Sequence, residues 1–565
     1  MDNQNLNLAT SVADNGGPTQ TLAVESGSFA IVAGSWDASV STDQRGFTRS
    51  NPPTIGAYEY FTNTWTGAVS STWSNNANWS RSTIPVIGVN VEIPNVATAP
   101  VISGGNTAIC NDLTVNTDAS LTINLGASFI TNGTITKLGT IEVNDMVSYD
   151  SWYFISSPVA GAQSGMFEGY YLQTWDESAG EWNDVTELTG PLTPLKGFGL
   201  YCQTSAKPDV IYITYTGTPN TGDQSIGITY NATGTTSYKG ANLLGNPYPS
   251  YIDWDLVTGY GAKYTWRRAN ESYDAYTAVT GYGDGSQFLN PMEGFFIVTE
   301  STGTFDLDNA MRTNDNSKKS AKGFEKGLVL TAHSGEFENT LYLVFDETAS
   351  ENFELANDAW KLLSGTPGLA EIYSMNSDGK LSVDVRPESE SIQLGFVNDE
   401  AGIYNIAIKE IADISTTILE DTKTGTFHNL LSKAYEFAWN PDMDDEQRFK
   451  LHFKSVGINE NQISESNILI YAANNEIIIK NVTGIVETDG SRMVGTGCVS
   501  LTVTDMTGRI VLQQNISESE MTAIPVNLKT GVYVVIVRSG SGSGSGACST
   551  GSTVPLHKTE KIFIK

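Results

Sequence analysis

Side chains that could act as nucleophiles or metal ligands are few and widely separated in this sequence. Its 565 residues include 4 histidines and 4 cysteines. These are His333, His428, His452 and His557, and Cys110, Cys202, Cys498 and Cys548. A zinc site or a Cys/His nucleophile pair needs such residues close together, and no Cys-x-x-Cys pair or Gly-x-Ser-x-Gly motif lies near them. The sequence therefore predicts none of these catalytic or metal centres.

Carboxylates are the abundant chemical groups, and one run of them has a composition that suits a hard cation. The run contains Asp442, Asp444, Asp445 and Glu446. Calcium prefers several oxygen ligands, but the run lacks the glycine-spaced pattern of an EF-hand loop. We expect a solvated acidic turn, with calcium binding as the alternative, and no other cofactor.

Asp43 and Arg45, near the N-terminus, do not by themselves make a site for polysaccharide cleavage. Glycosidases and lyases need paired carboxylates, or a calcium–carboxylate site with a basic residue, on an exposed face. Asp43 and Arg45 lie in a glycine-containing turn, where a turn salt bridge is the expected role. We therefore expect a chain that is not an enzyme.

The charge balance and hydropathy exclude several classes of partner. The chain carries 32 basic and 63 acidic residues, which gives a net charge of -31. Such a surface repels phosphate backbones and anionic lipid headgroups, so nucleic acid is not an expected partner. No segment approaches the ~18 consecutive apolar residues of a transmembrane helix. Hydrophobic residues make up 39% of the chain, and its length indicates several domains with packed cores.

Residues 62–150 are predicted to form a short β-rich or solenoid domain. Apolar-Thr-apolar segments such as 113–115 and 121–123 recur between Gly or Asn residues, which is typical of a solenoid with one strand per turn. Three tryptophans precede these segments: Trp65, Trp73 and Trp79. They favour a hydrophobic cap, with a platform for sugar rings as the alternative.

Residues 151–306 are predicted to be a duplicated β domain. A Pro-x-x-Gly-Phe motif occurs at 194–198 and again at 291–295, and each copy has a proline-containing turn and a Trp/Tyr-rich hairpin before it. Repetition at this length indicates two copies of one unit. The aromatic residues favour a β core, with a glycan-binding groove as the alternative.

A change of composition separates the next domain. Residues 307–326 end in a run of Asn, Asp, Ser, Lys and Gly without periodicity, which predicts a linker. Residues 327–457 return to alternating strands, for example at 340–345 and 392–396, and predict a β-sandwich of two sheets.

Residues 1–61 carry four motifs in a fixed order. They are Asp14-Asn-Gly-Gly-Pro-Thr-Gln-Thr-Leu22, Gly27-Ser-Phe-Ala-Ile-Val-Ala-Gly34, Asp43-Gln-Arg-Gly-Phe47 and Ile55-Gly-Ala-Tyr-Glu59. This succession resembles the terminal coil of right-handed parallel β-helix proteins of the pectin-lyase-like, choice-of-anchor type. Phe29 and Val32 depart from the Pro and Asp usual there. The resemblance implies that further coils precede this segment.

Residues 464–565 carry the sharpest signal. A Val503-Thr-Asp-Met-Thr-Gly-Arg-Ile-Val511 hairpin, a Gly531-Val-Tyr-Val-Val-Ile-Val537 strand and a basic last strand, Lys561-Ile-Phe-Ile-Lys565, follow in order. This order resembles the type A C-terminal sorting domain of Bacteroidota type IX (Por) secretion cargo. The resemblance implies a small β-sandwich recognised by the outer-membrane translocon and sorting machinery. The sorting-signal positions that it implies are Asp505, Gly508, Arg509, Gly531, Tyr533, Lys561 and Lys565.

Two segments of this domain are longer than in the family that it resembles. They are 481–498 and 539–557, and each contains one cysteine. Cys498 and Cys548 could form a disulfide in an oxidising exterior, which would contribute about 4 kcal/mol on the chain-entropy estimate. Two free thiols are the equal alternative.

Together, these features predict an all-β, multidomain chain in which the end of a parallel β-helix or β-solenoid is followed by β-sandwich domains. The predicted function is that of a secreted, non-enzymatic protein of the outer cell surface, of adhesin or structural type. Surface glycans or lipopolysaccharide are the further partners expected. The alternative is the accessory C-terminal region of a polysaccharide-degrading β-helix enzyme whose catalytic coils lie upstream.

Overall fold

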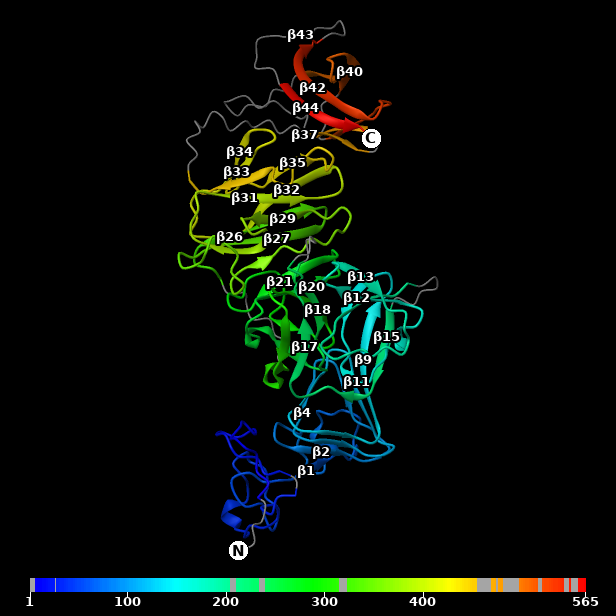
Figure 1. Cartoon of the computed structure of the whole chain (residues 1–565), viewed down its shortest axis with the longest axis vertical. Coiled ribbons are helices and arrows are strands. Elements are labelled where there is room, and N and C mark those ends of the chain that lie inside the picture. The colour runs from blue at the N-terminus through cyan, green and yellow to red at the C-terminus, as the bar shows by residue number, and fades with distance from the viewer. Residues whose placement is uncertain are drawn as a thin grey trace. The chain divides into compact units, whose positions relative to one another are not determined.

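The regular elements of the computed structural model are mainly strands (Figure 1). The structure describes residues 6–25, 27–203, 210–232, 239–314, 323–454, 469–473, 476–480, 497–516, 521–542, 548–549 and 557–564. Its helices are short 3-10 turns: η1 (Ala38–Val40), η2 (Asn76–Asn78), η3 (Ser164–Phe167), η4 (Trp254–Leu256) and η5 (Asn309–Met311). The predicted all-β class is confirmed. No helix of the described residues is long and apolar enough to span a membrane.

The chain divides into two compact units. The first contains Met1–Arg268, Ala278–Gly281 and Gly285–Ala321, and the second contains Ala269–Thr277, Tyr282–Asp284 and Lys322–Lys565. The domain boundaries drawn from the sequence stay predictions.

The N-terminal segment of the first unit is held by a polar network more than by strands. Its bridges, such as Leu8–Val24 and Ala13–Thr21, are isolated and antiparallel. Parallel strands need a coil above or below with which to pair, and here the described residues before Thr62 pair with one another instead. The predicted β-helix coil is therefore not confirmed. The expected turn salt bridge is confirmed, with Arg45 Nη2 lying 2.7 Å from Asp43 Oδ2.

Residues 62–148 form three short parallel ladders. They join β1 (Thr62–Thr64), β2 (Asn90–Ile93), β5 (Leu113–Val115) and β8 (Ile135–Lys137); β3 (Val101–Ile102), β6 (Ser120–Ile123) and β9 (Thr140–Ser148); and β4 (Thr107–Cys110) and β7 (Ser128–Thr131). Val91 pairs with Leu113, and Leu113 with Ile135, so the backbone returns to the same face after each coil. A single coil contributes strands to up to three ladders, because the chain bends between short strands and continues on a new face of the coil. The expectation of one strand per turn of the coil is therefore wrong.

The three tryptophans that precede these ladders form a hydrophobic core. Trp65, Trp73 and Trp79 are buried. The Trp79 ring makes edge contacts with the other two rings, at centroid distances of 5.0 and 4.7 Å. Its indole N–H donates to the Trp73 carbonyl at 2.9 Å. Buried rings cannot stack on a sugar, so the cap is the interpretation that the structure supports.

The two copies in residues 151–306 share a strand order. In the first sheet β14 (Phe198–Tyr201) lies between β10 (Trp152–Ile155) and β12 (Tyr171–Asp176), which also pairs with β13 (Glu181–Asp184). In the second, β23 (Gly294–Val298) lies in the same way between β18 (Ala241–Gly245) and β20 (Ala262–Arg267). The remaining strands of this region are β11 (Val159–Ala160), β15 (Val210–Thr216), β16 (Thr218–Pro219), β17 (Gln224–Ile228), β19 (Tyr251–Asp253), β22 (Phe288–Leu289), β24 (Gly303–Leu307) and β25 (Arg312–Thr313).

The Pro-x-x-Gly-Phe motif of each copy contacts the other copy. Lys196 bridges to Leu244, and Glu293 bridges to Ile155. A Cβ on Gly197 would lie 2.3 Å from the Leu244 carbonyl oxygen, so only glycine allows this approach. Rings from both sheets meet between them, with the Trp175 and Phe296 centroids 5.6 Å apart. The aromatic residues therefore build a core here, as favoured over a glycan groove.

The predicted linker begins later than the sequence indicates. Arg312 is buried, and its guanidinium donates to the Phe129 carbonyl at 2.7 Å and to the Ser250 hydroxyl at 3.0 Å. The ordered chain thus continues through β25 to Thr313. Residues 315–322 of the predicted linker lie outside the described residues.

Residues 327–452 of the second unit form one hydrogen-bonded sheet of 11 strands. They are β26 (Gly327–Ser334), β27 (Phe337–Phe345), β28 (Ala359–Trp360), β29 (Glu371–Met375), β30 (Lys380–Arg386), β31 (Ser391–Val397), β32 (Gly402–Ala412), β33 (Ile418–Asp421), β34 (Thr426–Asn429), β35 (Tyr435–Trp439) and β36 (Phe449–His452). The sequence predicts two sheets. In the structure β27 pairs with both β26 and β30, so the strands on its two sides belong to one hydrogen-bonded sheet. Alternate residues of these strands pack into one hydrophobic core.

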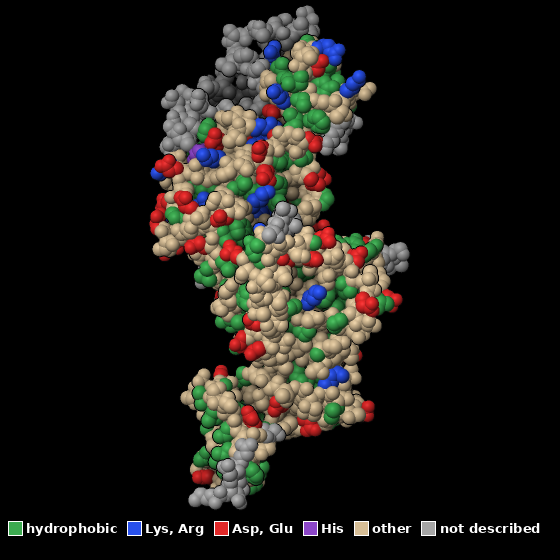
Figure 2. Space-filling view, in the orientation of Figure 1, with side chains coloured by type: hydrophobic (Ala, Val, Ile, Leu, Met, Phe, Trp, Pro, Cys, Tyr) green, Lys and Arg blue, Asp and Glu red, His purple; other side chains and the backbone are tan. Residues whose placement is uncertain are grey.

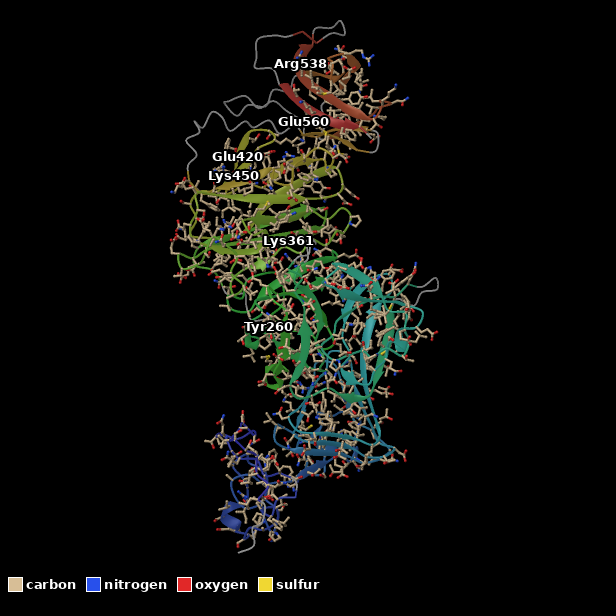
Figure 3. All side chains as sticks on the ribbon, viewed as in Figure 1. Tyr260, Lys361, Glu420, Lys450, Arg538 and Glu560 are labelled. Carbon is tan, nitrogen blue, oxygen red and sulfur yellow. The ribbon has the colours of Figure 1, made fainter. Side chains whose placement is uncertain are left out.

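Acidic and basic side chains lie on the visible face of this unit (Figure 2). Glu420 and Lys450 are cross-strand partners on β33 and β36 (Figure 3). One further strand of this unit is β21 (Ser272–Thr277).

The C-terminal domain consists of two sheets around its own core. One contains β37 (Leu469–Ala473), β38 (Glu476–Lys480) and β41 (Met521–Pro525). The other contains β39 (Gly497–Asp505), β40 (Ile510–Ile516), β42 (Gly531–Gly542), β43 (Cys548–Ser549) and β44 (His557–Ile564). Alternate residues of β42, from Tyr533 to Val537, are buried. The two long segments predicted at 481–498 and 539–557 lie largely outside the described residues.

Candidate functional site

The register of the C-terminal sheet brings distant motifs to one end of it. Asp505, the last residue of β39, pairs with Tyr533 on β42, and Tyr533 pairs with Ile562 on β44. Gly531, at the start of β42, pairs with Ile564. We call this end of the sheet the hairpin end; it consists of residues 505–510, 531–534 and 561–564.

The hairpin end collects most of the residues that the sequence singles out. It contains Asp505, Gly508, Arg509, Gly531, Tyr533 and Lys561. Lys565 lies outside the described residues. Residues up to about 60 positions apart in sequence are neighbours here because β42 is the common partner of β39 and β44. Their role in sorting stays a prediction.

The Asp505 carboxylate shapes the turn between β39 and β40. Its Oδ1 accepts hydrogen bonds from the Thr507 hydroxyl at 2.6 Å, the Thr507 N–H at 3.0 Å and the Arg509 N–H at 3.1 Å. Its Oδ2 accepts from Arg509 Nε at 3.0 Å. The Thr507 hydroxyl bond, aided by the other donors, lowers the pKa of Asp505 to about 2. Gly508 has a φ of +84°, which an L side chain rarely adopts.

Tyr533 fixes the start of the central strand. Its ring is buried in the domain core, and its hydroxyl donates to the Lys529 carbonyl at 2.7 Å. Gly531 differs, because a Cβ there would meet its neighbours only at ordinary contact distances, 3.8 Å from the Lys529 oxygen. The structure gives no steric reason for glycine at this position.

The exposed part of the hairpin end combines a cation with apolar side chains. The Arg509 side chain is 78% exposed. Met506 in this turn and Ile510, the first residue of β40, are exposed large hydrophobic residues. Hydrophobic and basic side chains lie side by side on the C-terminal domain (Figure 2). Met506 and Ile510 were missed by the sequence reasoning, and the available signal was two large apolar residues in a hairpin turn that usually takes polar ones.

The acidic run at 442–446 is built into a set of ion pairs. Asp444 Oδ1 lies 2.8 Å from Lys423 Nζ, and its other oxygen lies 3.3 Å from Arg448 Nη1. Glu446 lies 2.8 Å from Lys380 Nζ. No group of three or more His, Cys, Asp or Glu side chains within the described ranges could hold a metal ion. Cations of the protein thus pair with Asp444 and Glu446, two of the four carboxylates of this run, which does not favour calcium here.

The predicted cysteine pair flanks one strand. Cys498 pairs with Gly540 on one side of β42, and Cys548 pairs with Gly542 on the other side. Both side chains lie outside the described part of the chain, so the disulfide stays a prediction.

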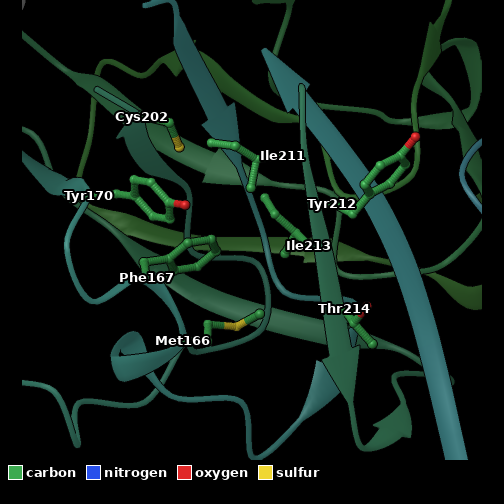
Figure 4. A pocket seen from close by; sticks show the side chains of 8 residues that line it. All are labelled: Met166, Phe167, Tyr170, Cys202, Ile211, Tyr212, Ile213 and Thr214. Atoms are coloured by element: carbon green, nitrogen blue, oxygen red, sulfur yellow. The ribbon is translucent and has the colours of Figure 1, made fainter. Parts of the chain in front are cut away.

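The first unit contains a cavity of about 220 Å³ (Figure 4). Its lining is Met166, Phe167, Tyr170, Cys202, Ile211, Tyr212, Ile213 and Thr214. Burial raises the pKa of the Cys202 thiol to about 11, so the thiol stays protonated at neutral pH. No carboxylate or histidine is part of this lining to activate it.

Two regions of the chain match known family models. Residues 64–149 and 258–453 match a domain of unknown function, DUF8693. Residues 459–546 match a secretion system C-terminal sorting domain, and this match includes the hairpin end as far as β42. The first match omits the residues between 149 and 258, which hold the first copy of the duplicated unit.

One curated relative is similar over most of the chain. It is the minor fimbrium subunit Mfa5 of Porphyromonas gingivalis, 23% identical over 525 residues. The alignment covers 74% of this chain and 41% of that protein, so the chain spans less than half of the relative's length. Among solved structures, the BSP domain of a biofilm associated protein aligns over 75% of this chain and 95% of that chain, at 10% identity and a TM-score of 0.14. That score is too low to support a shared fold.

These similarities indicate a secreted protein of the cell surface. The sorting domain also implies interaction with the type IX secretion machinery. The predicted localisation is thereby confirmed.

Proposed function

We propose that this chain is a non-enzymatic surface protein, of structural or adhesin type, which is exported and attached through its C-terminal domain. The observation that carries the proposal is the hairpin end, where the turn at 505–510 and the start of β42, both within the residues that match the sorting domain, meet the last strand, β44. A receptor that reads this end contacts residues from β39, β42 and β44 together. An unfolded or truncated domain cannot present that combination.

The exposed side chains give this surface a mode of binding. Arg509 offers a guanidinium that can pair with a carboxylate of the translocon or sorting machinery. Met506 and Ile510 offer apolar area beside it. Apolar area flanked by a cation is typical of a protein interface. Asp505, Gly508 and Tyr533 act in this scheme by holding the turn and the strand in place.

The preceding β domains are the exported passenger. Aromatic residues of these domains pack against one another in the hydrophobic cores, which supports a structural role more than the stacking of sugar rings on them. The relative to which the chain is similar is named as a minor fimbrium subunit. We extend that role to this chain, with surface glycans or lipopolysaccharide as its contacts outside the cell.

The rival function is that of an accessory region of a polysaccharide-degrading β-helix enzyme. The parallel ladders of residues 62–148 favour it, because they have the pairing of a solenoid. Binding to a glycan array without hydrolysis by this chain would favour the surface protein, whereas cleavage of a polysaccharide would favour the enzyme.

A reporter fusion tests the export function. Residues 464–565 are fused to a fluorescent protein in a host that carries the type IX machinery, and surface fluorescence is compared with that of a fusion lacking 557–565. We expect surface fluorescence only from the complete domain, since β44 pairs along the full start of β42. Retention of the complete fusion in the periplasm would overturn the proposal.

A further inference from the structure

A buried lysine, asparagine and glutamate meet in the large sheet of the second unit, far in sequence from the hairpin end. Lys361 follows β28, Asn339 lies on β27, and Glu371 is the first residue of β29. Lys361 Nζ lies 2.9 Å from Asn339 Oδ1 and 2.8 Å from Glu371 Oε2. The side chains of Lys361 and Glu371 are only 3% and 4% exposed. Figure 3 marks Lys361 in this unit.

Such a cluster is costly if its only role is packing. Removing a lysine and a glutamate from water carries a large penalty, and hydrophobic residues of similar volume often stabilise a core equally well. The neighbouring core residues of this sheet, such as Leu341 and Ile372, are apolar. A buried amine that donates to a buried carboxamide oxygen needs an explanation beyond packing.

The asparagine amide is oriented for attack by the amine. Asn339 Oδ1 accepts hydrogen bonds from Lys361 Nζ and from the Ile372 N–H, the latter at 3.0 Å. The backbone N–H can only donate, so it identifies this atom as the oxygen. A carbonyl bond is about 1.2 Å long, so Cγ lies within about 4 Å of the lysine nitrogen. The Ile372 N–H is also placed to stabilise negative charge that develops on the oxygen.

The glutamate is held where it can move a proton. Its Oε1 accepts from the Ser364 N–H at 2.9 Å and from the Ser364 hydroxyl at 3.0 Å. Its Oε2 is buried and, despite its short distance to Lys361 Nζ, has no aligned hydrogen bond within the described residues. A desolvated carboxylate oxygen next to an ammonium group is positioned to act as a general base.

We propose that Lys361 and Asn339 join in an intramolecular amide bond, with Glu371 as the catalytic proton carrier. Glu371 takes a proton from the Lys361 ammonium, and the neutral amine attacks Cγ of Asn339. A new Nζ–Cγ bond forms, and Glu371 returns the proton to Nδ2. The Cγ–Nδ2 bond then breaks, and Nδ2 leaves as ammonia with its own two protons and the one that Glu371 returned. The lysine nitrogen keeps one proton as the new amide N–H, and its other proton passes to the released ammonia, which departs as ammonium. The reaction needs no oxidant, reductant or added cofactor.

The bond would clamp strands that the sheet does not pair at this point. Asn339 and Lys361 lie 22 residues apart in sequence, on either side of the loop that leads from β27 to β28. An amide bond, unlike a disulfide, resists thiol reductants. This inference goes beyond the proposed export function, because it concerns a covalent modification within the passenger.

Peptide mapping of the full-length protein tests the bond directly. Without it, trypsin cleaves after Lys361 and yields peptides 327–361 and 362–380. With it, Lys361 is no longer a substrate, and one peptide covering 327–380 appears, lighter than its sequence by one ammonia. We expect that single lighter peptide to predominate in the wild-type protein. Complete cleavage after Lys361, or a 327–380 peptide of unaltered mass, would overturn the inference.

Two matched variants test the role of the carboxylate. In Glu371→Gln the proton carrier is removed, and we expect bond formation to slow by about 100-fold or more. In Glu338→Gln, a half-buried carboxylate beside Asn339 on the same strand, which pairs with Lys409, is removed, and we expect the wild-type peptide map. Circular dichroism of both variants checks that the fold is retained. Bond formation at the wild-type rate in Glu371→Gln would exclude Glu371 as the proton carrier.

Discussion

Two turns, one near each end of the sequence, make nearly the same Asp–Arg hydrogen bonds, but the arginine is buried in one and exposed to solvent in the other. Asp43 accepts from the Arg45 N–H at 2.9 Å and from Arg45 Nε at 2.8 Å. Asp505 accepts from the Arg509 N–H at 3.1 Å and from Arg509 Nε at 3.0 Å. The Arg45 side chain is 1% exposed, whereas that of Arg509 is 78% exposed.

The difference lies in what each guanidinium touches. Arg45 also donates to the carbonyls of Gly88 and Glu59, and its guanidinium lies 3.8 Å from the centroid of the Tyr58 ring. Arg509 has exposed apolar neighbours on its own turn and faces solvent. An Asp–Arg turn thus packs its arginine into the interior of the N-terminal segment in one case, and presents its arginine to solvent as a candidate binding group in the C-terminal domain.

Arg45→Ala should have the largest effect on stability. Removing one partner of a buried, hydrogen-bonded ion pair costs about 3–5 kcal/mol, because Asp43 remains buried without its counter-charge. Hydrogen exchange of the backbone amides in residues 41–61 would measure the local loss. Protection factors that stay within about threefold of the wild type would show that the two turns do not differ as described.

Asp505→Ala should abolish the hairpin turn and with it most of the export. The carboxylate is the acceptor for four donor groups of Thr507 and Arg509. We expect surface-exposed protein to fall by about tenfold, the change that follows from the loss of one good charge-assisted contact. Quantitative surface labelling of cells measures this. Asp43→Ala, which alters the other turn, should leave the C-terminal domain exportable.

The Asp505 carboxyl of the exposed turn should stay ionised until the pH falls close to 2. The pKa of Asp505 is lowered to about 2, from an ordinary value of about 3.9. A carboxylate with a depressed folded pKa contributes stability above its ordinary pKa and loses that contribution as the pH falls through the folded value. Carboxyl chemical shifts should therefore give a midpoint close to pH 2. A midpoint near pH 4 would mean that the turn hydrogen bonds are not formed.

Arg509→Ala should have the smallest effect on stability. Its ion pair with Asp505 is exposed to solvent, where such pairs contribute little. We expect no measurable change in melting temperature, although export decreases. A clear drop in melting temperature would indicate that Arg509 is structural like Arg45.

The sequence was informative wherever local chemistry decides the structure. The Asp43–Arg45 salt bridge, the Thr507-Gly508 turn and the apolar strand from Gly531 to Val537 follow from residue types and short spacings. The Pro-x-x-Gly-Phe repeats also indicated two copies, which the shared strand orders support. Turn and alternation patterns are local properties, so a single sequence carries them.

Long-range pairing was beyond the sequence. Nothing local indicates that three strands rather than one make a turn of the coil in residues 62–148, or that 11 strands of the second unit share one sheet. Burial also was not readable, since Asp43-Gln-Arg45 and Asp505 to Arg509 look equally exposed in sequence. The Lys361, Asn339 and Glu371 cluster joins residues that no spacing motif connects.

The most direct test of the account changes the exposed face of the hairpin end and leaves its framework intact. The full chain carrying Met506→Ser, Arg509→Ala and Ile510→Ser is produced in a host with type IX secretion, beside the wild type. Surface protease accessibility is measured on intact cells, and thermal unfolding on purified protein. The account predicts a folded variant that stays inside the outer membrane. Export of the triple variant at the wild-type level would contradict it.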